Sequence, residues 1–220
     1  MTGFTRQRSW IALFVAVLSA ATFGGVAGAT GAAPPSTVAV DLGTLGGSSS
    51  RATAVSPSGQ VVGSSQTAGG QTHAFAWTQA GGMIDLGTLG GTFSSAVAVS
   101  PAGQVVGSGT TAGGEEHAFS WTQAGGMIDL GTLGANFGLG GNFSFAVAVS
   151  PGGQVVGFST TAGGEGHAFS WTQAGGMIDL GTLGGTFSSA TAVNPGGHVV
   201  GLSTTASGAG HAVLWRLRSS

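Results

Sequence analysis

Short runs of alternating residue types recur along the chain, separated every few residues by sequences that favour turns. In the stretch after Ser95, four such runs are expected to be strands because Val, Thr and aromatic residues are common in them. A Ser-Pro-Ala-Gly turn joins the first two, since proline presets φ at its second position and glycine suits its fourth. The pattern predicts a four-stranded, up-and-down unit. Its strands are expected at Ala96 to Val99, Gln104 to Ser108, His117 to Thr122 and Met127 to Leu133.

Side-chain alternation on the third expected strand predicts how such units pack. Successive side chains of a strand point to opposite faces, so His117, Phe119 and Trp121 share one face and Ala118 and Ser120 the other. The first strand carries small residues, and we expect the large face of one unit to pack on a small face of the next. A single unit cannot bury its aromatic face alone, whereas stacked copies can.

The same unit occurs four times in the sequence. Both the DLGTLG motif and the HAF motif repeat with a period of about 44 residues, apart from one longer step with extra residues near 135–140. A period in the forties is typical of propeller blades or of helical pairs. The abundance of Gly, Val, Thr and Ser favours blades. The motifs begin at Asp41, Asp85, Asp129 and Asp179, and at His73, His117, His167 and His211.

The two ends of the repeat array predict how the fold closes. Val38 to Leu45 has the sequence of a lone fourth strand, and His211 to Trp215 that of a lone third strand. If these two strands pair, sixteen strands form a ring with no open sheet edge. The predicted fold class is therefore all-β, a β-propeller of four four-stranded blades closed by the N-terminal strand. The alternatives are an open β-solenoid and a partial propeller that closes by dimerisation.

The N-terminal segment has the three parts of a secretory signal peptide. Two arginines precede an uncharged run from Trp10 to Phe23, and an Ala-Gly-Ala sequence then supplies a cleavage site. A retained membrane anchor is the alternative, although the apolar run is short for a bilayer span. We therefore expect a signal peptide at residues 1–29, a linker at residues 30–37 and a repeat β-propeller domain at residues 38–220, in an extracellular protein.

Composition narrows the classes of function. The chain has no cysteine and no lysine, and it has only five arginines. A nucleic-acid partner is not expected, because phosphate backbones are bound by clustered cations. Disulfides and thiol nucleophiles are excluded. No second apolar span is visible, so we expect no membrane contact once the signal peptide is removed. Neither a cofactor nor a metal is expected.

Three repeated stretches resemble a known family. They are H-A-F-x-W, M-x-D-L-G-T-L-G-G and x-P-x-G-x-V-V-G, and they resemble the HAF-repeat family of extracellular repeat proteins. The resemblance covers Asp41 to Trp215 and implies export and a repeat fold, without a particular biochemical activity. The last unit departs from the motif, since Val213 takes the Phe position and Arg216-Leu217-Arg218 replaces the start of a turn. Both changes suit a terminal unit.

The repeated polar residues are candidates for a repeated site or for a repeated structural contact. Four converging imidazoles would suit zinc, and a ring of carboxylates would suit calcium. The histidines, however, share a face with Phe and Trp, and neutral residues flank each aspartate. The third and fourth strands are neighbours, so we expect a His–Asp hydrogen bond within each blade. Structural roles are therefore assigned to His73, His117, His167, His211, Trp77, Trp121, Trp171, Trp215, Asp41, Asp85, Asp129 and Asp179. His198 belongs to no series and is expected at the surface.

The insertion ANFGLGGNFSF breaks the repeat symmetry. Binding residues tend to lie on loops carried by a rigid scaffold, and an apolar loop often marks a contact surface. The candidate binding residues are Phe137, Leu139, Phe143 and Phe145. We expect no catalytic residue, because nearly every His and Asp occupies a repeated position and no G-x-S-x-G nucleophile motif stands between a strand and a helix.

The function expected from the sequence is that of a secreted, non-catalytic binding or structural module at the cell surface or in the matrix. Its partner would be a glycan or another protein, and self-association into a homo-oligomer is left open. Two alternatives remain. One is an extracellular enzyme with a site in the propeller channel, and the other is a calcium-stabilised scaffold.

Overall fold

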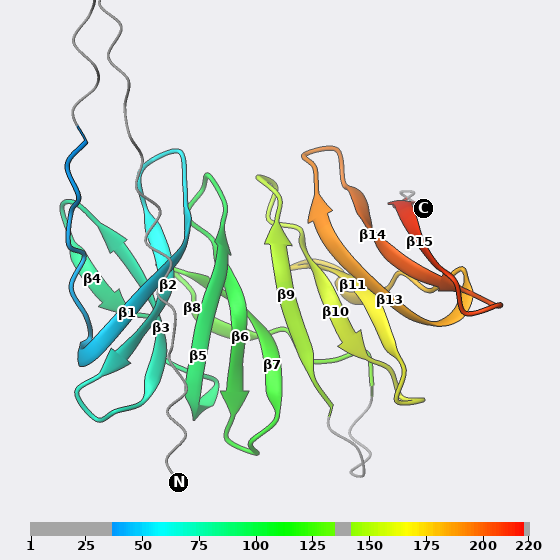
Figure 1. Cartoon of the computed structure of the whole chain (residues 1–220), viewed down its shortest axis with the longest axis horizontal. Helices are drawn as coiled ribbons and strands as arrows, with labels where there is room; N and C mark the ends of the chain where they lie inside the picture. The colour runs from blue at the N-terminus through cyan, green and yellow to red at the C-terminus, as the bar shows by residue number, and fades with distance from the viewer. Residues whose placement is uncertain (1–36, 135–141, 218–220) are drawn as a thin grey trace, which may run out of the picture. The chain divides into compact units, whose positions relative to one another are not determined.

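A computed structural model describes residues 37–134 and 142–217, and every regular element in these residues is a β-strand (Figure 1). The described residues from Val40 onward belong to one compact unit. The expected signal peptide, nearly all of the expected linker, Phe137 and Leu139 lie outside the described residues. In the part that is described, no helix is long and apolar enough to span a bilayer.

The fifteen strands fall into four repeat units, numbered here in chain order. Unit 1 contains β1 (Gly46–Val55), β2 (Val61–Thr67), β3 (Thr72–Thr78) and β4 (Gly82–Asp85). Unit 2 contains β5 (Gly90–Val99), β6 (Val105–Thr111), β7 (Glu116–Thr122) and β8 (Gly126–Asp129). Unit 3 contains β9 (Ser144–Val149), β10 (Val155–Thr160), β11 (Gly166–Thr172) and β12 (Gly176–Asp179). Unit 4 contains β13 (Gly184–Val193), β14 (His198–Thr205) and β15 (Gly210–Arg216).

Strands within each unit pair antiparallel in chain order, which is the up-and-down arrangement that the sequence predicts. A parallel bridge from Thr72 to Phe93 joins β3 to β5, and one from Gly166 to Phe187 joins β11 to β13. These bridges merge units 1 and 2 into one mixed sheet, and units 3 and 4 into another. The prediction of an all-β fold is confirmed.

The closed four-bladed ring is not confirmed, because neither sheet closes on itself. Residues 37–44 form no strand, and Leu45 makes a parallel bridge to Thr67 in unit 1. The Leu45 N–H donates to the Ser65 hydroxyl at 2.9 Å, and the Ser50 hydroxyl donates to the Gly43 carbonyl at 2.7 Å. Among the described strands, β15 pairs with β14 alone. The N-terminal segment therefore contacts unit 1 and forms no pair with the last strand.

The fourth strand of each complete unit is shorter than expected. β8 ends at Asp129, whereas the sequence pattern suggested a strand up to Leu133. The Asp129 carboxylate accepts a hydrogen bond from the Gly131 N–H at 2.8 Å, and Gly131 has a φ of 70°. A left-handed glycine directly after the aspartate turns the chain out of the sheet.

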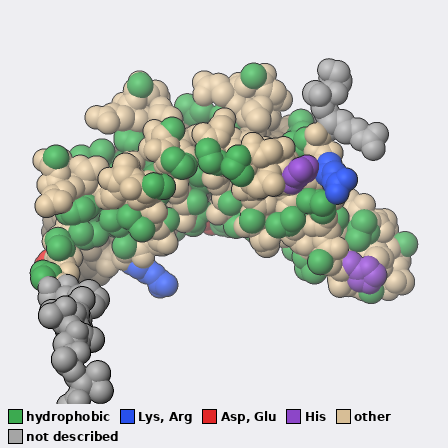
Figure 2. All heavy atoms as spheres, turned by 90° about the horizontal axis from the view of Figure 1, so that it is seen from above, with side chains coloured by type: hydrophobic (Ala, Val, Ile, Leu, Met, Phe, Trp, Pro, Cys, Tyr) green, Lys and Arg blue, Asp and Glu red, His purple; other side chains and the backbone are tan. Residues whose placement is uncertain are grey.

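Few charged side chains are visible on the face that Figure 2 shows, where apolar side chains alternate with backbone and neutral polar atoms. Charged residues are 5% of the chain. The repeat units therefore depend on hydrophobic packing and on neutral hydrogen bonds much more than on ion pairs.

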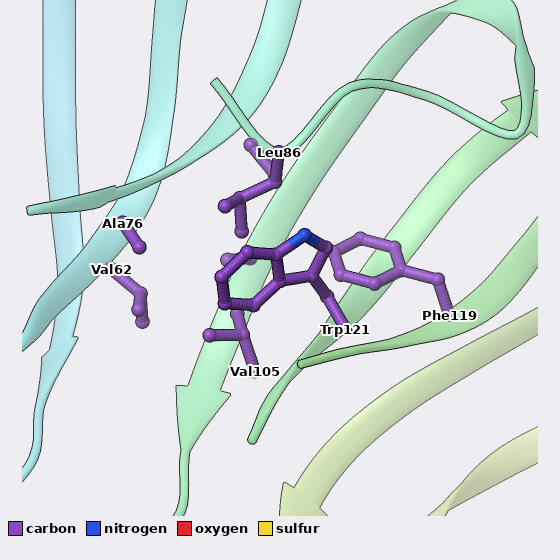
Figure 3. Close-up of a cluster of buried hydrophobic side chains, with 8 residues drawn as sticks. Val62, Ala76, Leu86, Val105, Phe119 and Trp121 are labelled. Carbon is purple, nitrogen blue, oxygen red and sulfur yellow. The ribbon is translucent and has the colours of Figure 1, made fainter. Parts of the chain in front are cut away.

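Hydrophobic clusters lie between successive units. In the first, the aromatic side chains of Phe119 and Trp121 from unit 2 pack with Val62, Ala74 and Ala76 of unit 1. Figure 3 shows the Trp121 indole between Leu86 and Val105, with the Phe119 ring beside it. Equivalent clusters join unit 2 to unit 3 and unit 3 to unit 4.

The expected direction of this packing is wrong. The large face of each unit packs on the preceding unit. The small face that receives it is formed by the second and third strands, together with a partly buried alanine of the first strand, Ala54 or Ala98. The reason is the alternation along the third strand, which places Ala74 and Ala76 opposite to Phe75. The first strand contributes Ala96 to the large face of its own unit.

The glycine of each V-V-G motif has a steric role that the sequence pattern did not reveal. β5 has a register irregularity between Ala96 and Ala98, opposite Val106 and Gly107. A Cβ atom on Gly107 would lie 2.0 Å from the Ser95 carbonyl oxygen and 2.9 Å from the Phe119 ring. Only glycine allows the two strands and the aromatic ring to approach so closely. Gly63, Gly157 and Gly201 are restricted in the same way.

Candidate functional site: repeated His–Asp pins and inter-unit grooves

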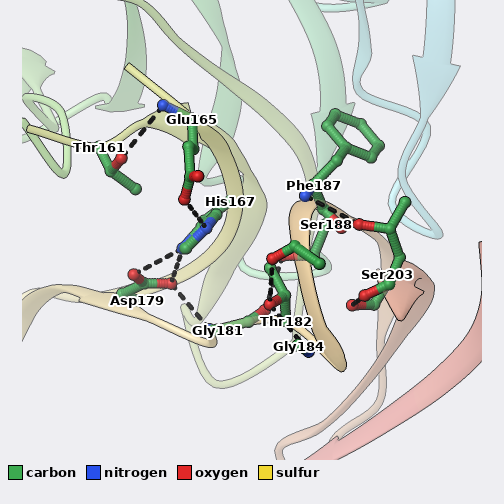
Figure 4. Close-up of polar contacts among 12 residues, drawn as sticks. Thr161, Glu165, His167, Asp179, Gly181, Thr182, Gly184, Phe187, Ser188 and Ser203 are labelled. Atoms are coloured by element: carbon green, nitrogen blue, oxygen red, sulfur yellow. Dashed lines mark hydrogen bonds and ion pairs between the residues drawn. The ribbon is translucent and has the colours of Figure 1, made fainter. Parts of the chain in front are cut away.

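A histidine on the third strand of each complete unit contacts the aspartate that ends the fourth strand. In unit 3 the His167 Nδ1 atom lies 2.8 Å from Oδ2 of Asp179, and Oδ1 of Asp179 accepts from the Gly181 N–H at 2.7 Å (Figure 4). Units 1 and 2 repeat this geometry, again with 2.8 Å between Nδ1 and Oδ2. We call this contact the His–Asp pin. It joins two strands and the turn that follows them, as the sequence predicts.

The pin fixes the histidine tautomer. An ionised carboxylate only accepts hydrogen bonds, so the Nδ1 atom carries the proton. The Nε2 atoms of His73, His117 and His167 are buried and have no hydrogen-bond partner among the described residues. Glutamate carboxylates lie 3.6 Å from Nε2 of His117 and 3.4 Å from Nε2 of His167. The equivalent position in unit 1 is Gln71, so the glutamate is not part of the common pin.

A serine hydroxyl connects each unit to the next. The Ala118 N–H of unit 2 donates to the Ser144 hydroxyl of unit 3 at 2.8 Å, and that hydroxyl donates to the Gly131 carbonyl at 2.6 Å. Ser94 and Ser188 make the same two bonds at the other junctions. We call these three residues the joint serines. They were not predicted, although their recurrence at one position of the repeat is visible in the sequence.

The remaining members of the predicted series occupy the two end units. His211 on β15 and Asp41 are both exposed, and neither forms a pin with any described residue. Trp121 and Trp171 are buried between units, whereas Trp77 and Trp215 are only partly buried. The structure therefore brings together three of the four predicted His–Asp pairs.

No group of His, Asp or Glu side chains with the arrangement of a metal site occurs among the described residues. The histidines of units 1 to 3 do not converge, since each one is bound to an aspartate of its own unit. The aspartates are likewise spread over separate units. His198 is exposed, as expected, and its N–H donates to the Asn194 side chain at 3.0 Å.

Two of the candidate binding residues form an aromatic patch with a third residue. The rings of Phe145 and Phe158 stack with centroids 5.2 Å apart, and Phe143 lies 5.6 Å from Phe145 and 5.9 Å from Phe158. The patch is partly exposed and is confined to unit 3. In unit 2, Ser95 and Ser108 pair at the positions of Phe145 and Phe158. The sequence analysis missed Phe158, which an alignment of the four V-V-G stretches would have singled out.

A groove of about 360 Å³ lies between units 2 and 3. It is lined by Gln104, Ser120, Thr122, Trp171 and Gln173, together with turn glycines. The side chain of Gln104 donates to the Ser120 hydroxyl at 2.8 Å. None of the described residues that line the groove carries an ionisable side chain.

A related groove lies at the junction of units 1 and 2. It is smaller, about 130 Å³, and is lined by Gln60, Thr78, Trp121 and Gln123. Amide, hydroxyl and indole groups therefore recur at successive junctions, and we call these two depressions the inter-unit grooves. The sequence analysis did not predict them, because each combines side chains from two different units.

A scan against models of protein families finds none that matches the chain, and a search of curated proteins finds no match.

Proposed function

We propose that this protein is a secreted, non-catalytic repeat module that acts at the cell surface or in the extracellular matrix and binds an uncharged glycan. The observation that carries this proposal is the pair of inter-unit grooves, which combine neutral hydrogen-bonding side chains with a tryptophan. The pins support the non-catalytic part, because each pinned aspartate already binds a histidine and a turn amide.

The chemistry of the grooves suits a sugar. Amide and hydroxyl groups donate and accept hydrogen bonds, as sugar hydroxyls do. The exposed edge of an indole, whose ring is otherwise buried between units, adds a small apolar surface with one N–H donor. A charged ligand would find no counter-ion among the described groove residues. A neutral polar ligand with small apolar faces fits this environment best.

The finer description of the fold belongs to the same proposal. We propose that the units are propeller blades and that the chain is a partial propeller, related to the HAF-repeat family by its motifs. Support comes from the four-stranded up-and-down units and from the packing of each unit on the preceding one. Export is supported by the N-terminal sequence. A mature N-terminus at Thr30 in the culture medium is the expected result, and retention of the intact chain in cells would argue against export.

The groove proposal is tested by screening the protein on an array of neutral glycans and measuring binding of the best ligand by calorimetry. Gln173 is exposed at the rim of the larger groove, so Gln173→Ala is expected to weaken binding at least five-fold without changing the melting temperature. The matched control is Gln71→Ala, an exposed glutamine outside both grooves, which is expected to have no effect. Equal affinity of the two variants would refute the groove as the binding site.

The aromatic patch is a rival contact surface, since Phe143 and Phe145 are two of the four binding residues predicted from the sequence. A Phe145→Ser/Phe158→Ser variant copies the residues that unit 2 carries at these positions, so folding is expected to be retained. We expect glycan affinity to be unchanged. A loss of binding in this variant alone would move the site from the groove to the patch.

A further inference from the structure

We propose that unit 4 of one copy binds unit 1 of a second copy head to tail, through the same contacts that join the units within the chain. The inference rests on one part of the proposed function, namely that the units are structural repeats. It does not depend on glycan binding. Four observations on the end units carry it.

The first observation is an incomplete pin at each end. His211 occupies the place of His73, His117 and His167 in the repeat but contacts no described aspartate. Asp41 occupies the place of the pinned aspartates, and its carboxylate already accepts from the Gly43 N–H at 3.0 Å. Each end therefore presents one half of a contact that forms three times inside the chain, with an Nδ1–Oδ2 distance of 2.8 Å each time.

The second observation is an unpaired strand edge. In units 1 to 3 the third strand pairs with a short fourth strand, with Ala76 opposite Ile84, Ser120 opposite Ile128 and Ser170 opposite Ile178. The corresponding residues at the ends are Leu214 on β15 and Val40. Their exposed fractions are 47% and 66%. The segment from Val40 to Asp41 therefore has the sequence of a fourth strand, which unit 4 does not contain within the residues described, up to Leu217.

The third observation is a set of apolar residues on the end units that are more exposed than their counterparts at internal junctions, although Phe75 on the large face of unit 1 is fully buried. Val62, Val106 and Val156 are fully buried by the following unit, whereas Val200 at the same position of unit 4 is 42% exposed. At the other end, Val99 and Val149 pack into the clusters between units, whereas Val55 of unit 1 is 65% exposed. This exposed face of unit 4 corresponds in position to the surface that receives a large face at every internal junction, with Leu214 in the place of Ala76, Ser120 and Ser170.

The fourth observation is a serine in the position of the joint serines. Ser50 of unit 1 donates to the Gly43 carbonyl at 2.7 Å, just as Ser144 donates to Gly131. At internal junctions the serine hydroxyl also accepts from an alanine N–H of the preceding unit. At the proposed interface that donor is the Ala212 N–H of the other copy. The contacts of the apolar face, the strand edge, the His–Asp pin and the serine can therefore all form in one alignment of unit 4 of one copy with unit 1 of another.

A second copy is the partner to which we commit, because the described N-terminal segment is held by unit 1 and β15 pairs with β14 alone. A head-to-tail contact of this kind uses different surfaces on the two copies. It gives a closed ring if the rotation between copies closes and a filament if it does not. Pairing of the two ends within one chain is the outcome that would overturn the proposal.

The test uses a disulfide, since the chain has no cysteine of its own. We would replace Val40 and Leu214 by cysteine in the full chain, oxidise the protein over a range of concentrations and analyse it on a non-reducing gel. Residues that face each other on antiparallel strands have Cα atoms roughly 4.5–5.5 Å apart, a separation that a disulfide spans. The expected product is a covalent dimer or ladder whose yield rises with protein concentration.

The matched control is Ser120→Cys/Ile128→Cys, which places cysteines at the equivalent pair inside unit 2. It is expected to form a disulfide within one chain at every concentration. If Val40→Cys/Leu214→Cys also gives only a cross-linked monomer, the ends pair within one chain and the proposal is wrong. If it gives no cross-link while the control does, the ends do not pair and the proposal is equally wrong.

A mixing experiment keeps the test decisive if the double variant folds poorly. Val40→Cys and Leu214→Cys are made as separate single variants. Head-to-tail pairing predicts a disulfide dimer in the mixture that contains one chain of each kind, and little dimer from either variant alone. Equal dimer yields with and without mixing would contradict the pairing register.

Discussion

The repeated histidines and aspartates are explained by the positions of individual atoms. Each pinned aspartate bonds a histidine with its carboxylate and closes a turn with its Oδ1 atom. The pairing of these residue types could be predicted from the sequence, because the third and fourth strands of a blade are neighbours and the two residues are always 12 positions apart. That the Nε2 atoms are buried without a hydrogen-bond partner in the described part of the chain could not be predicted, since their burial depends on packing around the ring.

The pin is tested by Asp129→Ala. The substitution leaves the Nδ1–H of the largely buried His117 and the Gly131 N–H without their acceptor, so we expect a loss of about 1–3 kcal/mol in unfolding free energy. Chemical denaturation followed by tryptophan fluorescence measures it.

Glu115→Ala is the control for that substitution. The Glu115 side chain is as exposed as that of Asp129, 44% against 41%, and approaches the other side of the same ring at 3.6 Å without a hydrogen bond. Its removal is expected to change the unfolding free energy by less than about 0.5 kcal/mol. If the two variants were equally destabilised, the aspartate would have no special role.

At the scale of the elements, alternation and turn motifs predict the strands well. The four expected strands of unit 2 all form, because a period of two and the Ser-Pro-x-Gly turn are local signals. The direction of packing was predicted wrongly. The pattern shows that Ala118 and Phe119 lie on opposite faces, but it does not show which neighbouring unit each face meets. Two of the three residues of the aromatic patch were candidate binding residues, whereas Phe158 joins it from a strand outside the insertion.

The junction between units 2 and 3 is tested by Ser144→Ala. The Ala118 N–H loses its acceptor, and both are buried, so we expect a loss of about 1–3 kcal/mol in unfolding free energy. Hydrogen exchange of the Ala118 amide is expected to become faster.

Ser50→Ala is the matched control for the junction. Ser50 holds the same position in unit 1 but donates only to the Gly43 carbonyl and lies exposed. In dilute protein its substitution is expected to cost less than about 0.5 kcal/mol, as is usual for surface positions. A cost equal to that of Ser144→Ala would show that the hydrogen bond between units contributes nothing.

At the scale of the whole molecule, the number of units could be counted in the sequence, whereas ring closure could not be predicted. Ring closure depends on the rotation between neighbouring units. Side chains in the clusters between units, such as Trp121, determine this rotation, and no local motif encodes it. The complementary ends were visible in the sequence as a lone fourth strand and a lone third strand. The structure adds that Val55 at one end and Val200 at the other are more exposed than their counterparts at the internal junctions.

The most direct test of this account is an NMR measurement of the histidine rings in protein labelled with ¹⁵N at histidine, recorded at increasing concentration. We predict three rings protonated at Nδ1 in dilute protein, from His73, His117 and His167, and a fourth that joins them as the concentration rises. His211→Gln should remove the fourth signal alone. Tautomer exchange at His117 in dilute protein would contradict the structural role of the pin. Four histidine rings protonated at Nδ1 at every concentration would contradict pairing between copies.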